Sequence, residues 1–211
     1  MKNVTWSSRF SKEIDSEVLD FSQSLSIDIV LYRADIEVTI AHVEMLSNCG
    51  HITVTEQRKI INALKKVNKL AETGKLKWSV KYEDVHMNIE NALVKLIGDV
   101  GKKIHLGRSR NDLITTDLRL YLRDFIDIYL DKIREIQLLI AKTALKHADS
   151  LFPGFTHMQV AQPVTFGHHL LAWGEMLYRD ELRLQNNREL MNIMPLGSAA
   201  LSGTSLKTDR K

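Results

Sequence analysis

Residues 108 to 152 contain no glycine and no proline, and this uninterrupted stretch limits the fold more than any other part of the chain. Because glycine and proline are the residues that most often end a helix, their absence favours one long helix. A helix from Asn111 to Asp149 would measure roughly 60 Å at about 1.5 Å per residue. Its main apolar positions recur at steps of three and four, the spacing of helices that run side by side, and they are Leu118, Leu122, Phe125, Tyr129, Ile133, Ile136, Ile140 and Ala144.

So long a helix would extend far from the core of a compact chain of 211 residues, whose radius of gyration is only about 17 Å. The segment Phe152-Pro153-Gly154 breaks the pattern, Gln162-Pro163 forms a short extended connection, and a second long helix is expected from about Phe166 to Met194. Further apolar residues lie beside the main stripe of the first helix, as expected when several helices surround it. We therefore expect these helices to associate with other chains.

The first half of the chain predicts shorter helices. An amphipathic pattern runs from Asp28 to Leu46 and stops at Asn48-Cys49-Gly50. Thr53 and Glu56 have capping-box spacing, and Gly74 falls where the helix that they open would end. Residues 75 to 85 lose the helical period, and a shorter helix follows from about His86 to Gly98. The predicted fold is all-α with little or no sheet, with an N-terminal helical domain over 1–107 and part of a central helix bundle over 108–211.

Composition and charge exclude several classes of protein. With 44% hydrophobic and 26% charged residues, a formal charge of +3 and no Lys/Arg run, the chain has no signature of a nucleic-acid partner. No stretch reaches the roughly 18 apolar residues of a membrane span, and the N-terminus lacks the apolar run of a signal peptide. The single cysteine, Cys49, fits a reducing cytoplasm. His168 and His169 have no further ligand at metal-binding spacing, so no metal is expected.

Two polar clusters lie at the ends of the long helix. The segment Gly107-Arg108-Ser109-Arg110-Asn111-Asp112 brings guanidinium groups, small hydrogen-bonding side chains and unpaired backbone N–H groups to a helix N-terminus, which suits a carboxylate-rich small molecule. The segment Phe155-Thr156-His157-Met158-Gln159-Val160-Ala161-Gln162-Pro163 contains a histidine that can transfer a proton near neutral pH. In this segment, Gln159 and Gln162 are expected to be buried hydrogen-bonding residues. The pattern indicates anion binding combined with acid–base chemistry.

These two segments, together with Glu83-Asp84-Val85-His86-Met87-Asn88-Ile89-Glu90, resemble the argininosuccinate lyase family of the aspartase/fumarase superfamily. The resemblance extends from Trp6-Ser7-Ser8-Arg9-Phe10 to the segment that begins at Pro195 and ends at Gly203. The Thr-His-x-Gln cluster points to the superfamily, and the Gly-Arg-Ser-Arg-Asn-Asp string points to the argininosuccinate branch. The family's signature loop, with its Met-Pro-x-Lys-Lys-Asn core, has no match in this sequence. We therefore expect an incomplete portion of such an enzyme, inactive alone.

The resemblance implies a β-elimination that splits argininosuccinate into arginine and fumarate, a step of arginine biosynthesis. It also implies a homotetramer whose active sites each combine segments of three subunits, and it implies no cofactor. His157 matches the family's proton-transfer histidine, and the family's catalytic serine and anion-stabilising lysine belong to the missing loop. The matched or chemically suited substrate-binding residues are Ser24, Asp84, His86, Ser109, Arg110, Asn111 and Thr156.

Several alternatives stay open at this point. Ser24, with Ser22 and Ser26 beside it, is equally suited to cap a helix, and Asp84 is equally suited to be the N-cap of the helix at His86. Arg108 is expected to pair within the protein rather than with a ligand. A non-catalytic helical assembly protein, or another lyase of the superfamily such as adenylosuccinate lyase, remains the alternative function.

Overall fold

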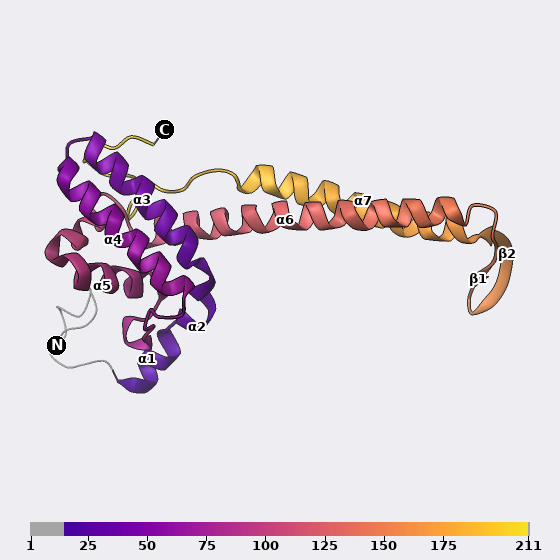
Figure 1. The fold of residues 1–211 in the computed structure, drawn as a ribbon, viewed down its shortest axis with the longest axis horizontal. Helices are drawn as coiled ribbons and strands as arrows, with labels where there is room; N and C mark the ends of the chain where they lie inside the picture. Colours follow the sequence, from indigo (N-terminus) through magenta and orange to yellow (C-terminus); the bar gives the residue numbers. More distant parts are fainter. Residues whose placement is uncertain (1–14, 211) are drawn as a thin grey trace. The chain divides into compact units, whose positions relative to one another are not determined.

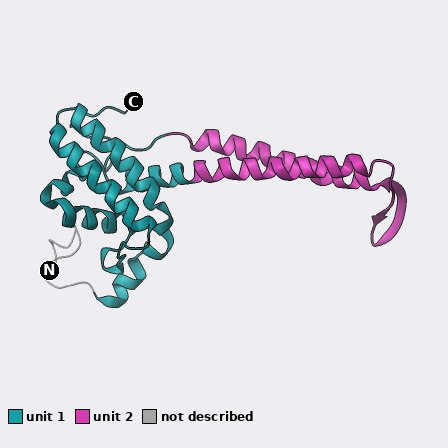
Figure 2. Cartoon of the chain, viewed as in Figure 1, with its two compact units in different colours: residues 1–121, 194–211 teal, residues 122–193 magenta. Residues whose placement is uncertain are grey.

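The computed structural model describes residues 15–210, so the expected resemblance at Trp6 to Phe10 lies outside the described residues (Figure 1). The regular structure is almost entirely helical, which confirms the predicted fold class. The chain divides into two compact units, residues 15–121 with 194–210 and residues 122–193 (Figure 2). Helix α6 (Arg110–Lys146) begins in the first unit and continues into the second. The boundaries of these units differ from those of the predicted domains, 1–107 and 108–211, and the predicted domains stay a prediction.

The first unit is a cluster of helices around an apolar core. Its elements are α1 (Ser16–Ser22), α2 (Leu25–Asp28), the 3-10 helix η2 (Ile29–Leu31), α3 (Tyr32–Asn48), α4 (Val54–Glu72), the 3-10 helix η3 (Val80–Tyr82), α5 (Val85–Ile97), the 3-10 helix η4 (Gly98–His105) and the start of α6. Fully buried side chains from α3, α4 and α5 meet in the core, among them Leu46, Ile60, Leu64, Ile89 and Leu93. Burial of these apolar side chains is what holds the short helices together.

The predicted ends of these helices are largely confirmed. Thr53 and Glu56 form both hydrogen bonds of a capping box at the start of α4. Gly50 follows α3 with φ +82°, and Gly74 follows α4 with φ +67°, a left-handed conformation that favours glycine. The helix expected from Asp28 is interrupted instead, because η2 separates α2 from α3. The 3-10 helix η4 was not predicted from the sequence.

The second unit is a pair of long helices joined by a hairpin. Its elements are the remainder of α6, strand β1 (Leu151–Thr156), strand β2 (Gln159–Thr165) and α7 (Phe166–Met191). Two cross-helix ion pairs connect α6 and α7: Arg134 Nε lies 2.9 Å from Glu181 Oε1, and Arg188 holds Asp127 with contacts of 2.5 and 2.8 Å. Near the hairpin, the backbone N–H of Gly167 donates to the carbonyl of His147 at 3.1 Å.

Three expectations about this unit need correction. The long helix ends at Lys146 rather than at Asp149 or Phe152, because the N–H of His147 is shared between the carbonyls of Thr143 and Ala144 and the chain then turns. The second long helix ends at Met191 rather than at Met194. The expected short connection is a two-stranded antiparallel hairpin with an irregularity between Pro153 and Phe155. Strand pairing satisfies the backbone groups of a segment that two prolines keep out of a helix.

The second unit leaves much apolar surface uncovered. Both helices expose large apolar side chains, and those at least half exposed are Ile128, Leu138, Leu139, Leu145, Leu171, Trp173, Tyr178 and Leu190. The helices of the second unit therefore hide only part of their apolar surface by pairing with each other. Within residues 15–210, no helix is both long and apolar enough to cross a membrane.

Candidate functional site

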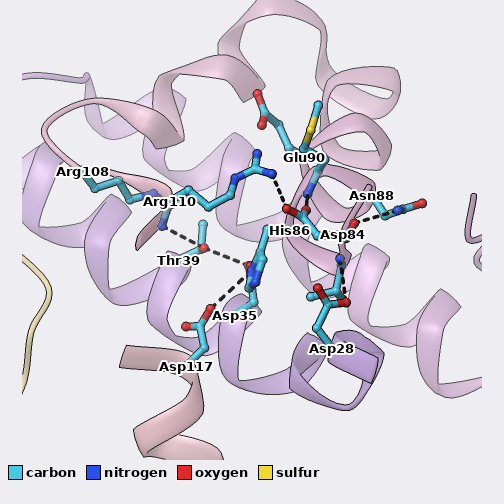
Figure 3. Close-up of polar contacts among 12 residues, drawn as sticks. Asp28, Asp35, Thr39, Asp84, His86, Asn88, Glu90, Arg108, Arg110 and Asp117 are labelled. Atoms are coloured by element: carbon cyan, nitrogen blue, oxygen red, sulfur yellow. Dashed lines mark hydrogen bonds and ion pairs between the residues drawn. The ribbon is translucent and has the colours of Figure 1, made fainter. Parts of the chain in front are cut away.

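Asp84 organises the first turn of α5. Its Oδ1 accepts a hydrogen bond from the backbone N–H of Met87 at 2.7 Å, which confirms Asp84 as the N-cap of that helix. Its Oδ2 forms an ion pair with Nη1 of Arg110, in the first turn of α6 (Figure 3). Asp84 is buried, whereas the side chain of Arg110 remains 25% exposed. One carboxylate thus caps a helix and also orients an arginine predicted to bind substrate.

Asp28 connects Ser24 to the start of α5, beside Asp84. The hydroxyl of Ser24 donates to Oδ2 of Asp28 at 2.6 Å, and Oδ1 of Asp28 accepts from the backbone N–H of Val85 at 3.1 Å. Ser24 occupies the N-cap position of α2, but its side chain makes no capping hydrogen bond. Asp28 therefore fixes the hydroxyl of Ser24 beside the start of α5.

Side chains at the start of α6 accept hydrogen bonds from its first backbone N–H groups. The backbone N–H of Ser109 donates to Oδ1 of Asp112 at 2.9 Å, and the N–H of Asn111 donates to the hydroxyl of Ser109 at 3.3 Å. Oδ2 of Asp112 accepts from the N–H groups of Gly197 at 3.2 Å and Ala199 at 2.7 Å. Asp112 thereby joins the C-terminal segment to the helix start. Asn111 is exposed, and within the described part of the chain its side-chain amide makes no hydrogen bond.

Arg108 turns inward, as predicted. Its Nη1 donates to the hydroxyl of Thr39 at 3.0 Å, and that hydroxyl donates to Oδ1 of Asp35 at 3.2 Å. Burial lowers the pKa of Arg108, while the charges of Asp35 and Asp117 act in the opposite direction. The two arginines of the motif therefore have different environments: Arg108 belongs to the interior and Arg110 to the pair with Asp84.

His86 is buried against two carboxylates. Its Nδ1 contacts Oδ2 of Asp35 and lies 3.5 Å from Oδ2 of Asp117 (Figure 3). The side chain of Asp117 is fully buried, and neither of its oxygens has a hydrogen-bond partner. Burial, and next the charge of Asp35, raise the pKa of Asp117 to about 9. The predicted substrate-binding residue His86 thus lies in the interior of the first unit.

His157 lies at the tip of the hairpin in the second unit. It and Met158 both have positive φ, +50° and +61°, and they connect the paired residues Thr156 and Gln159. Two successive non-glycine residues in this conformation carry backbone strain, a feature often found at functional sites. Thr156 and His157 are exposed. Gln159 and Gln162 are exposed as well, so the expectation that they are buried hydrogen-bonding residues is wrong.

The structure therefore brings together part of the predicted set. Within the first unit, hydrogen bonds and ion pairs connect Ser24 to the start of α5 through Asp28, and Asp84 to Arg110 at the start of α6 beside Ser109 and Asn111. His86 follows Asp84 in α5 but is directed to Asp35. Thr156 and His157 belong to the second unit.

Two carboxylates that position these groups were missed in the sequence. Asp28 lies four residues after Ser24, the spacing at which side chains on a helix meet. Asp112 lies three residues after Ser109, as the acid of a capping box does. The sequence shows both spacings. It does not show that Asp28 also accepts from Val85 or that Asp112 also accepts from Ala199, because these partners are distant in sequence.

Proteins of similar sequence are named argininosuccinate lyase. The chain is 52% identical over 206 residues to the argininosuccinate lyase of Alkalilimnicola ehrlichii, a match that covers 98% of this chain and 44% of that protein. It is 50% identical to the argininosuccinate lyase of Azotobacter vinelandii, covering 99% of this chain and 45% of that protein. The chain thus spans less than half the length of these relatives, and the resemblance seen in its motifs is confirmed.

Solved structures agree. The crystal structure of EDDS lyase in complex with formate superposes with a TM-score of 0.78 at 32% identity, over 91% of this chain and 37% of that one. A fumarate lyase described as delta crystallin, from Brucella melitensis, shares the fold with a TM-score of 0.70 at 18% identity. A family model described as lyase matches residues 8–211. Since that match takes in nearly the whole sequence, the chain belongs to the lyase family.

Proposed function

We propose that this chain supplies part of an argininosuccinate lyase, with argininosuccinate as substrate and arginine and fumarate as products. The observation that carries the proposal is the junction of the α5 and α6 starts, where Asp84 holds Arg110 beside Ser109 and Asn111. Sequence identity of 52% and 50% to two proteins named argininosuccinate lyase supports the substrate. The relatives are longer, so this chain alone holds only some of the groups that the reaction needs.

The reaction is a β-elimination. A base removes a proton from the carbon next to a carboxylate, and the electron pair of that C–H bond forms the double bond of fumarate. The C–N bond breaks with its electron pair leaving on the arginine nitrogen, which takes up a proton. As the proton leaves, negative charge collects on the carboxylate, so hydrogen-bond donors must be placed around it beforehand. The side chains of Ser24, Ser109, Asn111 and Thr156 have the right donors, and Arg110 adds a charged one. Asp84 and His86 stay predictions as pocket residues.

His157 is the proposed proton-transfer residue. Its position in a two-residue turn exposes the imidazole, and a neutral imidazole can take or give a proton near pH 7. The backbone strain at His157 and Met158 is a cost that a purely structural turn avoids by using glycine or asparagine. This strain favours a functional role for the tip.

The proposal includes a homotetramer in the cytoplasm, without a nucleic-acid partner. Large exposed apolar residues on α6 and α7, such as Leu139 and Trp173, support association through these helices. The same surface also suits a non-catalytic helical assembly protein. The polar junction at Asp84 and Arg110 favours the enzyme, because assembly alone does not require those groups.

A chimeric enzyme tests the proposal. Residues 1–211 alone should release no measurable fumarate from argininosuccinate. When they are joined to the remaining part of the Azotobacter vinelandii enzyme, activity should appear, with little or none on adenylosuccinate. His157→Asn should then lower the rate by about 10²–10⁴, the usual contribution of a general acid or base. His168→Asn, which alters an exposed histidine of α7, is the matched control. Turnover by residues 1–211 alone, or full activity of the His157 variant, would contradict the proposal.

A further inference from the structure

Unsatisfied polar atoms gather at one place inside the first unit. Among the described residues, five buried side-chain atoms lack a hydrogen-bond partner, and four of them belong to His86, Arg108 and Asp117, the fifth being on Gln23. Buried polar atoms are nearly always paired, because an unpaired one costs about 1–3 kcal/mol. Two of the four atoms are the carboxylate oxygens of Asp117, so this buried carboxylate lacks a hydrogen-bond partner among the described residues.

Three side chains at this place have the chemistry of metal ligands. Asp35 on α3, His86 on α5 and Asp117 on α6 each offer one ligand atom, and these atoms all lie within 4.8 Å of one another. Nδ1 of His86 contacts Asp35 and lies 3.5 Å from Oδ2 of Asp117. Figure 3 shows the carboxylates of Asp35 and Asp117 directed at the imidazole. Asp117, fully buried and without a hydrogen bond, is the side chain that most needs a partner.

We infer that Asp35, His86 and Asp117 form a structural site for a divalent transition-metal ion such as Zn²⁺. Carboxylate and imidazole donors bind such an ion at about 2.0–2.2 Å, so two donors of one ion are at most about 4.4 Å apart. The ligand atoms all lie within 4.8 Å of one another, and an ion would enter by parting the direct contact between Nδ1 of His86 and Oδ2 of Asp35. The ion would take the place of the hydrogen bond between His86 and Asp35 and would give Asp117 its partner.

The charges nearby permit a cation despite Arg108. The carboxylates of Asp35, Asp117, Glu90 and Asp112 all act on the Arg108 guanidinium. When ionised, four negative groups and one positive group leave a net charge of −3, so a divalent ion reduces the excess. Arg108 itself is held away by its bond to Thr39 at 3.0 Å. An unpaired buried carboxylate is costly, so a cation that neutralises it stabilises the folded chain.

A structural role follows from burial and topology. All three ligands are at most 5% exposed, so the site has no open face for a substrate. Each ligand comes from a different helix, and the ion would therefore tie α3, α5 and α6 together. The sequence lacks any metal-binding spacing because the ligands are far apart along the chain, His86 and Asp35 by 51 residues. This inference does not depend on the proposed activity.

Metal binding by residues 1–211 tests the inference. After treatment with a chelator, the chain should bind one more Zn²⁺ per chain than its Asp117→Asn variant, measured by isothermal titration calorimetry. Zn²⁺ should raise the Tm of the native chain and leave that of the variant unchanged. Co²⁺ in place of Zn²⁺ should give visible absorption bands that the variant lacks. Asn is close in size to Asp and uncharged, so Asp117→Asn should fold without the metal.

Controls separate this site from adventitious binding at surface histidines, of which the chain has several among its eight. His86→Gln should lose the same single ion. His105→Gln, which changes a histidine that also contacts a carboxylate, Glu90 at 2.5 Å, should keep it. Equal stoichiometry and equal Tm shifts in the native chain and the Asp117→Asn variant would overturn the inference. So would a crystal structure of the Zn²⁺-soaked protein with no ion between these three side chains.

Discussion

Arg110 and Asp84 form an ion pair that joins the first turn of α6 to the N-cap of α5. The two residues are 26 positions apart in sequence, and each belongs to a different polar motif. Because Asp84 also accepts the N–H of Met87, the position of Arg110 is coupled to the start of a helix. Any ligand that Arg110 binds would meet an arginine that is already oriented.

Substitution of Asp84 separates its two roles. Asp84→Ala removes the helix cap and the partner of Arg110, and it should lower the free energy of unfolding by about 1–3 kcal/mol. Asp84→Asn keeps an oxygen that can accept from Met87 and should cost less, since the partly exposed Arg110 can turn to solvent. Urea denaturation of both variants measures the difference. Equal losses would mean that the ion pair, and not the cap, dominates.

His42 should make stability depend on pH. Burial, and next the charge of Arg108, lower its pKa to about 4 from the usual 6.5. Between these values the unfolded chain binds a proton that the folded chain does not, so the fold loses stability as the pH falls from about 6.5 to about 4. The loss due to His42 should be about 2–3 kcal/mol.

His42→Gln provides the comparison for this pH dependence. Glutamine can still donate to the carbonyl of Leu106, which His42 contacts at 2.9 Å, but it does not titrate. Stability curves of the two proteins, measured by denaturation from pH 4 to pH 7, should therefore diverge in favour of the variant at low pH. Parallel curves would show that His42 does not carry the effect.

Gly167 should be intolerant of a side chain. A Cβ added there would lie 2.5 Å from the carbonyl oxygen of Ala144 and 3.1 Å from that of His147, and both are backbone atoms. Gly167→Ala should therefore destabilise the chain by about 1–3 kcal/mol or more. Gly174→Ala is the control in the same helix, because its Cβ would meet only Ile140 at 3.7 Å. That variant should gain about 0.5–1 kcal/mol from helix propensity, and thermal melts would rank the two.

Association should depend on the apolar surface of α6. Leu139 is 65% exposed, so Leu139→Asp should leave the folded chain intact while it places an unpaired charge in the predicted contact. Light scattering should show a smaller particle with an unchanged circular dichroism spectrum. Lys66→Asp introduces the same residue at an exposed position of α4 and should not alter the mass. A monomeric native chain at micromolar concentration would refute the association argument.

Local signals predicted much of the helical fold. The absence of glycine and proline over 108 to 152 predicted α6, and the spacing of Thr53 and Glu56 predicted the start of α4. Asp84 as an N-cap was one of two interpretations, and the structure shows that the same carboxylate also serves Arg110. These features depend on residues within a few positions of one another, which is why sequence patterns reveal them.

Local sequence patterns specify which segments are helical, where most of them begin and end, and which side chains carry charge and hydrogen-bonding capacity. Which of these groups meet depends on how the helices pack. Asp117 shares a helix face with the buried Leu113, yet nothing local places it against His86 and Asp35. The hydrogen bond from the backbone N–H of Ala199 to Asp112, 87 residues away, likewise depends on packing. Helix periodicity arises from contacts over three or four residues, whereas a site forms from long-range contacts that the burial of apolar surface brings together.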